Sequence, residues 1–258
     1  MATHADDLSV ALRLADAADE ITMARFRADD LVVDRKPDRT PVTDADTAVE
    51  DAVRSRLAAA RPDDRILGEE RGGTLGADRT WIVDPIDGTK NFLRGGPTWA
   101  TLIALVVAGS PVVGVVSAPA LGRRWWASQG AGAFGSFGGA APRPLRVSGV
   151  RSLSDVYLST TDLNTWGPAL DRYLALVSEC WESRAFGDYW QHCLVAEGVL
   201  DLAVEPVAYA WDLAAVQVLV TEAGGSFTDL SGRPGFDHGS AIASNGHVHD
   251  AALAVLQG

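Results

Sequence analysis

The chain is poor in cysteine and in basic residues, and each shortage argues against a class of protein. Two cysteines in 258 residues cannot form the disulfide framework of a small secreted protein and fit a reducing cytosol. A net charge of −12 argues against nucleic acid or an anionic membrane as a partner, because both attract basic surface. We therefore expect a cytoplasmic protein in which Cys180 and Cys193 are small core residues.

The chain also lacks an uninterrupted hydrophobic run of membrane-spanning type. Residues 95–122 carry no charge, but Gly109-Ser110-Pro111 divides them into two halves rich in Val, Ile, Thr and Leu. This pattern predicts two buried strands joined by a turn rather than a membrane span. The acidic, polar residues 1–7 are not those of a signal peptide. A composition of 47% hydrophobic and 22% charged residues is typical of a soluble globular protein.

Two helices are predicted at the start of the chain. Apolar residues recur at i, i+3, i+4 and i+7 over residues 6–27, which predicts an amphipathic helix. After a loop at 36–41, Thr43 is a good N-cap for a second helix. Asp44 and Asp46 fall in its first turn, where the helix dipole favours negative charge. For Asp46 this is the interpretation that we prefer.

The remaining elements change in character near residue 148. Before it, strands are predicted at 66–70, at 81–84, in the two halves of 95–122 and at 125–126, the last leading into a Gly-rich surface hairpin at 130–139. After it, strands at 156–159 and 200–204 alternate with helices at 168–180, 188–198 and 212–223. We predict one compact unit with two subdomains, an N-terminal α+β half (1–148) and a C-terminal α/β half (149–258).

The most informative segment is 81–92, in which an apolar run ends in Asp84 and Asp87. Two carboxylates so close repel each other unless a cation lies between them. Hard oxygen ligands suit Mg²⁺, which leaves room for substrate phosphates. The following Gly88-Thr89-Lys90-Asn91 is typical of a turn entering a helix, whose free N–H groups bind anions. Asp-Pro and Asp-Gly are also ordinary turn dipeptides, so this segment alone leaves a plain strand-to-turn junction open.

Two further acids share this setting. Glu69 and Asp212 also lie where apolar segments break, so four separated acids are candidates for one metal cluster. Three histidines near the C-terminus, His238, His247 and His249, lack the cysteine or spaced acid that would complete a zinc site. We interpret them as exposed loop residues.

Several motifs resemble those of a known family. The segments Gly68-Glu69-Glu70, Asp84-Pro85-Ile86-Asp87-Gly88-Thr89 and Trp211-Asp212 resemble the three signature motifs of the inositol monophosphatase family. Residues 41–46 resemble its early threonine–aspartate motif, and the resemblance covers essentially the whole chain in the correct order. It implies an α/β (α+β) fold, an αβαβα layered sandwich of the inositol monophosphatase/fructose-1,6-bisphosphatase type. It also implies Mg²⁺-dependent hydrolysis of a small phosphate ester and a homodimer.

The resemblance assigns metal ligands. Glu69, Asp84 and the Ile86 carbonyl would hold one Mg²⁺, whose water is the nucleophile. Asp84, Asp87 and Asp212 would hold a second ion, which stabilises the leaving alkoxide. Glu69 would share a weaker third ion, so two to three ions are implied. This is the two-metal arrangement for in-line displacement at phosphorus.

The resemblance also assigns the groups that handle water and phosphate. Thr89, hydrogen-bonded to Asp44, would orient the water and help to deprotonate it, so that Glu69, Thr89 and Asp44 form the catalytic set. The amides of Gly88 and Thr89 would bind the phosphate, and Lys90 adds a cation beside it. Asp87 and Asp212 would contact the substrate as well as the metal.

A second stretch bears on the substrate. Residues 184–188, Arg-Ala-Phe-Gly-Asp, resemble the Arg-x-x-Gly-Asp stretch of the histidinol-phosphate phosphatases of this family. Together with residues 87–92 and 123–126, this stretch makes the chain most similar to the actinobacterial enzymes of that group. That substrate carries an ammonium and an imidazole, which Asp188 and Glu205 could meet. Tyr209 occupies a position where inositol enzymes often have histidine. A helix N-cap remains open for Asp188, and a surface ion pair for Arg184.

Three functions follow from these observations. The first is hydrolysis of histidinol phosphate in histidine biosynthesis. The second is hydrolysis of inositol 1-phosphate, a sugar bisphosphate or an adenosine phosphate. The third is a catalytically silent protein that binds phosphate or metal, which the completeness of the ligand set disfavours.

Overall fold

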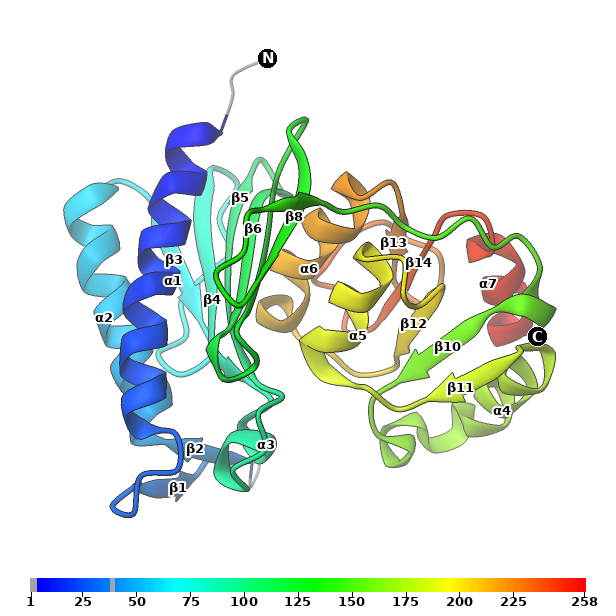
Figure 1. The fold of residues 1–258 in the computed structure, drawn as a ribbon, viewed down its shortest axis with the longest axis horizontal. Coiled ribbons are helices and arrows are strands. Elements are labelled where there is room, and N and C mark those ends of the chain that lie inside the picture. Colours follow the sequence, from blue (N-terminus) through cyan, green and yellow to red (C-terminus); the bar gives the residue numbers. More distant parts are fainter. Residues whose placement is uncertain (1–3, 38–39) are drawn as a thin grey trace.

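The computed structural model describes residues 4–37 and 40–258, whose helices and strands stack in five layers (Figure 1). Helices α1 (Ala5–Arg25) and α2 (Asp44–Ala60) cover one face of a seven-stranded sheet. Helices α5 (Asp188–Ala196) and α6 (Ala210–Glu222) separate it from a five-stranded sheet. Helices α4 (Leu170–Glu179) and α7 (His249–Gln257) cover the outer face of that second sheet. This is the αβαβα sandwich implied by the resemblance.

The larger sheet is antiparallel except at one edge. Its strands, in sheet order, are β3 (Arg65–Gly68), β4 (Arg79–Asp87), β5 (Ala100–Val107), β6 (Ser110–Ala118), β7 (Arg123–Ser128), β8 (Gly132–Phe137) and β9 (Arg143–Pro144). Only β3 and β4 run parallel. The predicted buried hairpin is confirmed as β5 and β6. Within the described ranges, no helix is both long and apolar enough to cross a bilayer.

The smaller sheet has the order β11-β10-β12-β14-β13. Its strands are β10 (Tyr157–Thr160), β11 (Glu182–Arg184), β12 (Leu202–Glu205), β13 (Ser226–Thr228) and β14 (Ala241–Ser244). A separate two-stranded ribbon of β1 (Val33–Arg35) and β2 (Pro41–Thr43) precedes α2, and a short helix α3 (Thr89–Leu93) follows β4. Residues 1–3 and 38–39, which belong to the predicted polar N-terminus and loop, lie outside the described residues.

The predicted helix starts and hairpins are largely confirmed. Thr43 caps α2 in a capping box, because its Oγ1 accepts from the Asp46 amide while Asp46 Oδ2 accepts from the Thr43 amide at 2.8 Å. The predicted position of Asp46 in the first turn of this helix is therefore confirmed. The Gly-rich stretch 130–139 does belong to a hairpin, but most of it is strand β8 paired with β7 rather than loop.

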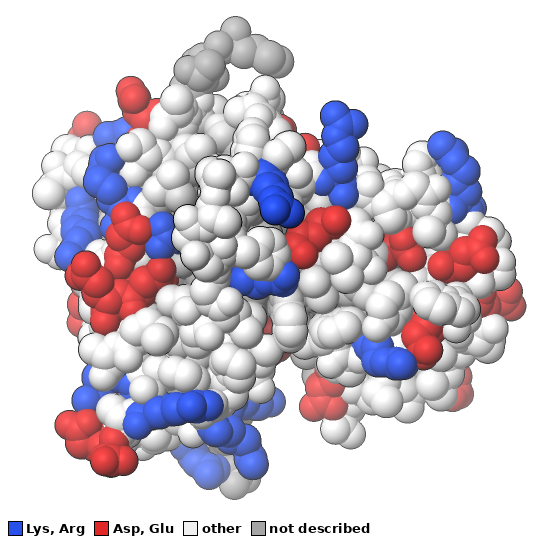
Figure 2. All heavy atoms as spheres, in the orientation of Figure 1, with Lys and Arg blue, Asp and Glu red and all other residues white. Residues whose placement is uncertain are grey.

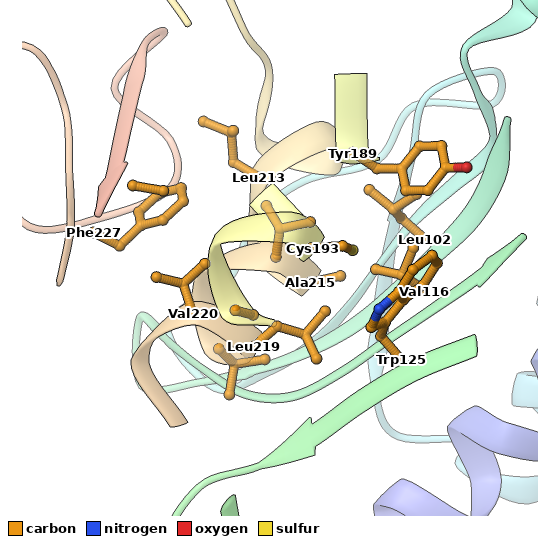
Figure 3. Close-up of a cluster of buried hydrophobic side chains, with 14 of the residues drawn as sticks. Leu102, Val116, Trp125, Tyr189, Cys193, Leu213, Ala215, Leu219, Val220 and Phe227 are labelled. Carbon is orange, nitrogen blue, oxygen red and sulfur yellow. The ribbon is translucent and has the colours of Figure 1, made fainter. Parts of the chain in front are cut away.

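The central core lies between the two sheets, around α5 and α6. Figure 3 shows side chains of these helices between Leu102, Val116 and Trp125 of the larger sheet and Phe227 of the smaller one. Cys193 is buried in this core, as predicted, whereas Cys180 is only partly buried. On the face shown in Figure 2, basic side chains lie among acidic side chains and wide uncharged areas rather than in one field.

Gly114 in β6 marks a very close approach of α6 to the larger sheet. A Cβ at this position would lie 2.4 Å from Val218 Cγ1 and 2.5 Å from the Ala215 carbonyl oxygen. Relief requires a shift of the helix, and overpacking of this kind costs about 1–3 kcal/mol. We expect Gly114→Ala to lower the free energy of unfolding by about 2 kcal/mol, measured by urea denaturation. Gly149→Ala is the matched control, because a Cβ there meets no atom within 4 Å, and an unchanged Gly114→Ala midpoint would contradict the prediction.

Candidate metal centre

Three acidic side chains meet where β4 ends and α6 begins. Asp84, Asp87 and Asp212 each present a carboxylate oxygen, and these oxygens all lie within 4.8 Å of one another. Asp84 and Asp87 lie near the end of β4, and Asp212 lies in the first turn of α6. The fold thus brings together acids separated by more than a hundred residues in the sequence.

A bulge in β4 lets its two acids serve one site. Residues three apart on a regular strand point to opposite faces, but the register shifts between Asp84, opposite Leu102, and Asp87, opposite Ala100. Asp84 Oδ1 accepts from the Ile86 amide at 3.0 Å, which stabilises the bend. The sequence predicts that the strand ends at Asp84, whereas β4 continues to Asp87. Proline is tolerated in a strand at such a bulge.

The electrostatics of the cluster fit a cation site. Burial, followed by the charges of neighbouring carboxylates, raises the pKa of Asp84 and that of Asp87 well above the ordinary value. Burial, with the nearby Glu205 and Glu69, raises the pKa of Asp212 to about 8. Carboxylates that destabilise one another's charged forms gain from a divalent cation between them. The donors are hard oxygens, as Mg²⁺ requires.

Glu69 lies beside these three acids and binds a lysine. Its charge contributes to the raised pKa of Asp84. Lys36 Nζ is 2.6 Å from Glu69 Oε1 and 2.8 Å from Glu70 Oε1. The chain has only two lysines, Lys36 and Lys90, and this one places an ammonium against the predicted metal ligand. The sequence reasoning gave Lys36 no role.

Glu50 of α2 supports the turn that carries Glu69. Its side chain is fully buried and accepts hydrogen bonds from the amides of Glu70, at 2.7 Å, and Arg71, at 3.1 Å. Gly68 leaves the space that this carboxylate occupies, since a Cβ there would overlap it. The signal that could have identified Glu50 is an acid on the apolar face of α2, beside Val49 and Val53.

The two aspartates at the start of α2 have different surroundings. Asp44 Oδ2 accepts from Arg25 at 2.7 Å, and its other oxygen has no partner. The Thr89 hydroxyl donates to the Ile86 carbonyl at 2.9 Å. The described contacts therefore do not include the predicted Thr89–Asp44 hydrogen bond, because Arg25 holds Asp44.

Asp46, by contrast, is buried near the acidic centre. It is fully buried, and its Oδ1 has no hydrogen-bond partner. Burial is the main reason why its pKa is raised to about 6, and the charge of Glu69 adds to the shift. Asp46 therefore lies close enough to the acidic centre for Glu69 to act on it.

Three helices begin around the cluster. Gly88 precedes α3 with φ +83°, and a Cβ there would lie 2.8 Å from the Thr98 carbonyl oxygen, so only glycine fits. At α5, the Tyr189 amide donates to Asp87 Oδ2 at 2.6 Å, and at α6 the Tyr209 amide donates to Asp212 Oδ2 at 2.8 Å. Helix N-termini favour nearby negative charge, so these ends stabilise carboxylates and suit a bound anion.

A second acidic pair lies beside the first cluster. The charges of Asp188 and Glu205 both help to raise the pKa of Asp87. Burial, with the charge of Glu205, raises the pKa of Asp188 to about 6. Asp188 is the first residue of α5 with φ +48°, and the N-cap is Gly187. The N-cap alternative for Asp188 is therefore wrong, since the strained residue forms no cap hydrogen bond.

The other predicted substrate residues are more exposed. Arg184 is 54% exposed and pairs with Glu182 at 2.5 Å, which is the surface ion pair left open by the sequence. Lys90 is exposed, and its charge lowers the pKa of Asp188. Tyr209 is 55% exposed and stacks on Trp211. A contact of Arg184 with substrate stays a prediction.

One of the three C-terminal histidines differs from its prediction. His249 is buried, and its ring nitrogens lie 3.0 Å from the Thr228 hydroxyl and 2.9 Å from the Ser244 hydroxyl. It is the first residue of α7 and joins that helix to β13 and β14. The prediction of an exposed loop residue is wrong for His249, because two hydroxyls satisfy its buried ring.

The chain matches known proteins over almost its whole length. Residues 4–257 match the profile of the inositol monophosphatase family. The chain belongs to this family. Two relatives are the histidinol-phosphatases of Mycobacterium tuberculosis, 56% identical over 97% of this chain and 98% of that protein, and of Streptomyces coelicolor, 51% identical over 99% and 98%. A solved inositol monophosphatase from Zymomonas mobilis is 34% identical, covers 100% of both chains and superposes with a TM-score of 0.86.

Proposed function

We propose that this member of the inositol monophosphatase family hydrolyses histidinol phosphate to histidinol and phosphate, as a step of histidine biosynthesis. The observation that carries the proposal is the meeting of Asp84, Asp87 and Asp212 beside a second acidic pair, Asp188 and Glu205. The first group suits divalent cations and a phosphate, and the second suits a cationic organic group. The names of the two actinobacterial relatives support the same substrate.

We propose Mg²⁺ as the cofactor, bound as two to three ions. Asp84, Asp87 and Asp212 would hold them, joined by Glu69 and the Ile86 carbonyl. Bound there, the ions would supply an activated water and offset charge on the leaving oxygen. Glu69 would have to exchange the Lys36 ammonium for metal, because that ammonium lies 2.6 Å from its carboxylate.

The protein's own groups would position the water and accept its proton. The Thr89 hydroxyl, held on the Ile86 carbonyl, lies one residue beyond the Gly88 turn that suits phosphate. Asp46 is a better candidate than Asp44 for the acid behind Thr89, because it is fully buried and the charge of Glu69 contributes to its raised pKa, whereas Asp44 pairs with Arg25. A pKa of about 6 also suits a base that works near neutral pH.

The acidic pair favours a cationic substrate over a neutral one. Asp188 is partly buried and Glu205 is buried, so solvent screens these two carboxyl groups less than it screens surface acids. A substrate with an ammonium and an imidazole would pair with them through charge-assisted hydrogen bonds. Inositol 1-phosphate carries only hydroxyls on its organic half and would leave both carboxylates unpaired.

The test compares esters and one substitution. With Mg²⁺ present, we expect kcat/KM for histidinol phosphate to exceed that for inositol 1-phosphate or a sugar bisphosphate by at least about ten-fold. Glu205→Gln should reduce that preference by about ten-fold, mainly through KM, since a hydrogen bond to a charged group contributes about 1.5–3 kcal/mol. Glu179→Gln, which changes an exposed acid at the end of α4, is the control and should leave the preference intact.

Each alternative has its own outcome in this assay. Faster release of phosphate from inositol 1-phosphate would replace the proposed substrate with the second one. If none of the esters is hydrolysed while Mg²⁺ is bound to the folded chain, the result would support a catalytically silent protein.

We also propose that the protein is a cytoplasmic homodimer and that residue 148 separates two subdomains. The family resemblance supports the dimer, and two free cysteines suit a reducing compartment. Sedimentation velocity tests the dimer, and a mass of one chain would contradict it.

The larger sheet uses residues 65–144 and the smaller one residues 157–244, which supports the boundary at residue 148.

A further inference from the structure

Glu205 is held in place by three donors that the sequence did not reveal. It is the last residue of β12, and its side chain is 10% exposed. Thr161 Oγ1 donates to Glu205 Oε1 at 2.9 Å, and His192 Nε2 lies 3.0 Å from Oε2. Gln191 Nε2 donates more weakly to Oε2, at 3.4 Å. Both carboxylate oxygens therefore have partners, and the group has one preferred orientation.

A second row of hydrogen bonds fixes these donors. Gln191 Nε2 also donates to Thr161 Oγ1 at 3.2 Å, and its amide oxygen accepts from Ser159 Oγ at 3.0 Å. Ser159 in turn accepts from the Phe186 amide at 3.1 Å. The network joins β10, β12 and α5, so it ties the orientation of Glu205 to the fold rather than to a flexible side chain.

The donors orient Glu205 without cancelling its charge. Thr161 and Gln191 are neutral, and no lysine or arginine forms an ion pair with Glu205 among the ion pairs of residues 4–37 and 40–258. His192 is 1% exposed, and its Nδ1 is buried without a hydrogen-bond partner. An imidazolium would leave a charged N–H unpaired at that atom, which is more costly than an unpaired lone pair. The geometry favours the neutral tautomer that donates through Nε2.

His192 does not have the side chain that would be expected if its position served only the stability of the core. Its ring lies in the core, with its centroid 5.8 Å from that of Phe227, where an apolar side chain would leave no orphaned nitrogen. A buried polar atom without a partner costs about 1–3 kcal/mol. We infer that the hydrogen bond to Glu205 is the reason for a histidine at this position.

We propose that His192 is a positioning residue, assisted by Thr161, that holds the charged Glu205 carboxylate ready for the cationic organic end of the substrate. Glu205 lies near Asp87, Asp188 and Asp212, since its charge raises the pKa of each. Under the proposed function, this proximity puts Glu205 beside an ester whose phosphate is at the metal cluster. The inference rests on the proposed function and names an additional group that sets its specificity.

The test uses the full chain with Mg²⁺ and two esters, histidinol phosphate and 2-glycerophosphate, whose organic half carries no charge. His192→Phe should raise KM for histidinol phosphate by about ten-fold with kcat within about two-fold, because the hydrogen bond to a charged group is lost. The ratio of kcat/KM between the two esters should fall by the same factor. His192→Gln, which can donate from a similar position, should restore most of the ratio.

A double-mutant cycle separates positioning from general damage to the core. If His192 acts through Glu205, His192→Phe should have no further effect on selectivity in a Glu205→Gln background. An additive effect, or an equal loss on both esters, would overturn the proposal. Thr161→Val removes a donor that is only partly buried and should lower the same ratio, so the test stands even if His192→Phe does not fold.

Failure of this inference is distinguishable from failure of the proposed function. A wild-type enzyme with no preference for histidinol phosphate would refute the function. A wild-type preference that survives His192→Phe and Thr161→Val would refute only the positioning role.

Discussion

Asp87→Asn should abolish turnover and leave the fold intact. The substitution removes a charge from the three-carboxylate cluster, where it would help to hold the cations. Metal ions contribute several kcal/mol to the stabilisation of charge in such a transition state, so we expect kcat/KM to fall by at least about 1000-fold. The asparagine oxygen can still accept from the Tyr189 amide, which lies 2.6 Å from Oδ2. The junction between β4 and α5 should therefore survive.

The same substitution should raise the melting temperature of the metal-free protein. Asp188, Asp212 and Glu205 all raise the pKa of Asp87, which means that they repel its charge. A neutral amide removes this repulsion, as is common where catalytic groups are held against stability. Phosphate release and differential scanning fluorimetry in a chelator measure the two effects together.

Asp51→Asn is the matched control for Asp87→Asn. Asp51 is an exposed acid on α2 that pairs with Arg71, so its loss should change neither activity nor melting temperature appreciably. Retained turnover in Asp87→Asn would contradict the metal assignment. Loss of the folded state in Asp87→Asn would show instead that the carboxylate has a structural role.

Short motifs made part of the candidate metal centre predictable from the sequence. The bulge in β4 is the reason why the end of this strand was not. Asp84 and Asp87 are three residues apart, so the sequence alone places them near each other. The reach of β4 was not predictable, because Asp-Pro and Asp-Gly have the local signature of a turn. Only the pairing of β4 with β5 shows that the strand continues through Pro85. Strands β11 and β13 have three residues each, too few to show an alternating pattern.

The choice between Asp44 and Asp46 shows what helical periodicity can decide. Asp46 precedes Val49, Glu50, Val53 and Leu57 by three, four, seven and eleven residues, so all lie on one face of α2, and all are buried. Asp44 lies on another face and meets Arg25. The motif resemblance drew attention to both acids, but burial along α2 favours Asp46 as the partner of the acidic centre.

The network around Glu205 could not be predicted from the sequence. The sequence predicts helix α5, but no local pattern distinguishes Gln191 and His192 from ordinary core residues. Their partners come from β10 and β12, thirteen or more residues away. Such contacts depend on the parallel pairing of β10 and β12, which no local pattern specifies.

The metal-free protein should lose stability as the pH rises from 7 to 8. In the folded state burial and neighbouring carboxylates raise the pKa of Asp212 to about 8, and they also raise the pKa values of Asp84 and Asp87 well above the ordinary value near 4. The folded chain then binds more protons than the unfolded chain, whose carboxylates are already ionised at pH 7. Stability is therefore fully present at low pH and falls as the pH rises, by at most about 1.4 kcal/mol per pH unit for each proton.

Mg²⁺ should remove most of this pH dependence, because it binds the ionised carboxylates of the folded state. Melting temperatures in a chelator and in excess Mg²⁺ measure the difference at each pH. The window lies above the titration of His249, whose pKa is lowered by burial, and far above that of Asp229, whose pKa is about 2. Asp212→Asn should flatten the slope in the chelator. If the wild-type protein in the chelator melts at a higher temperature at pH 8 than at pH 7, the pKa values of these acids are not raised in the folded state.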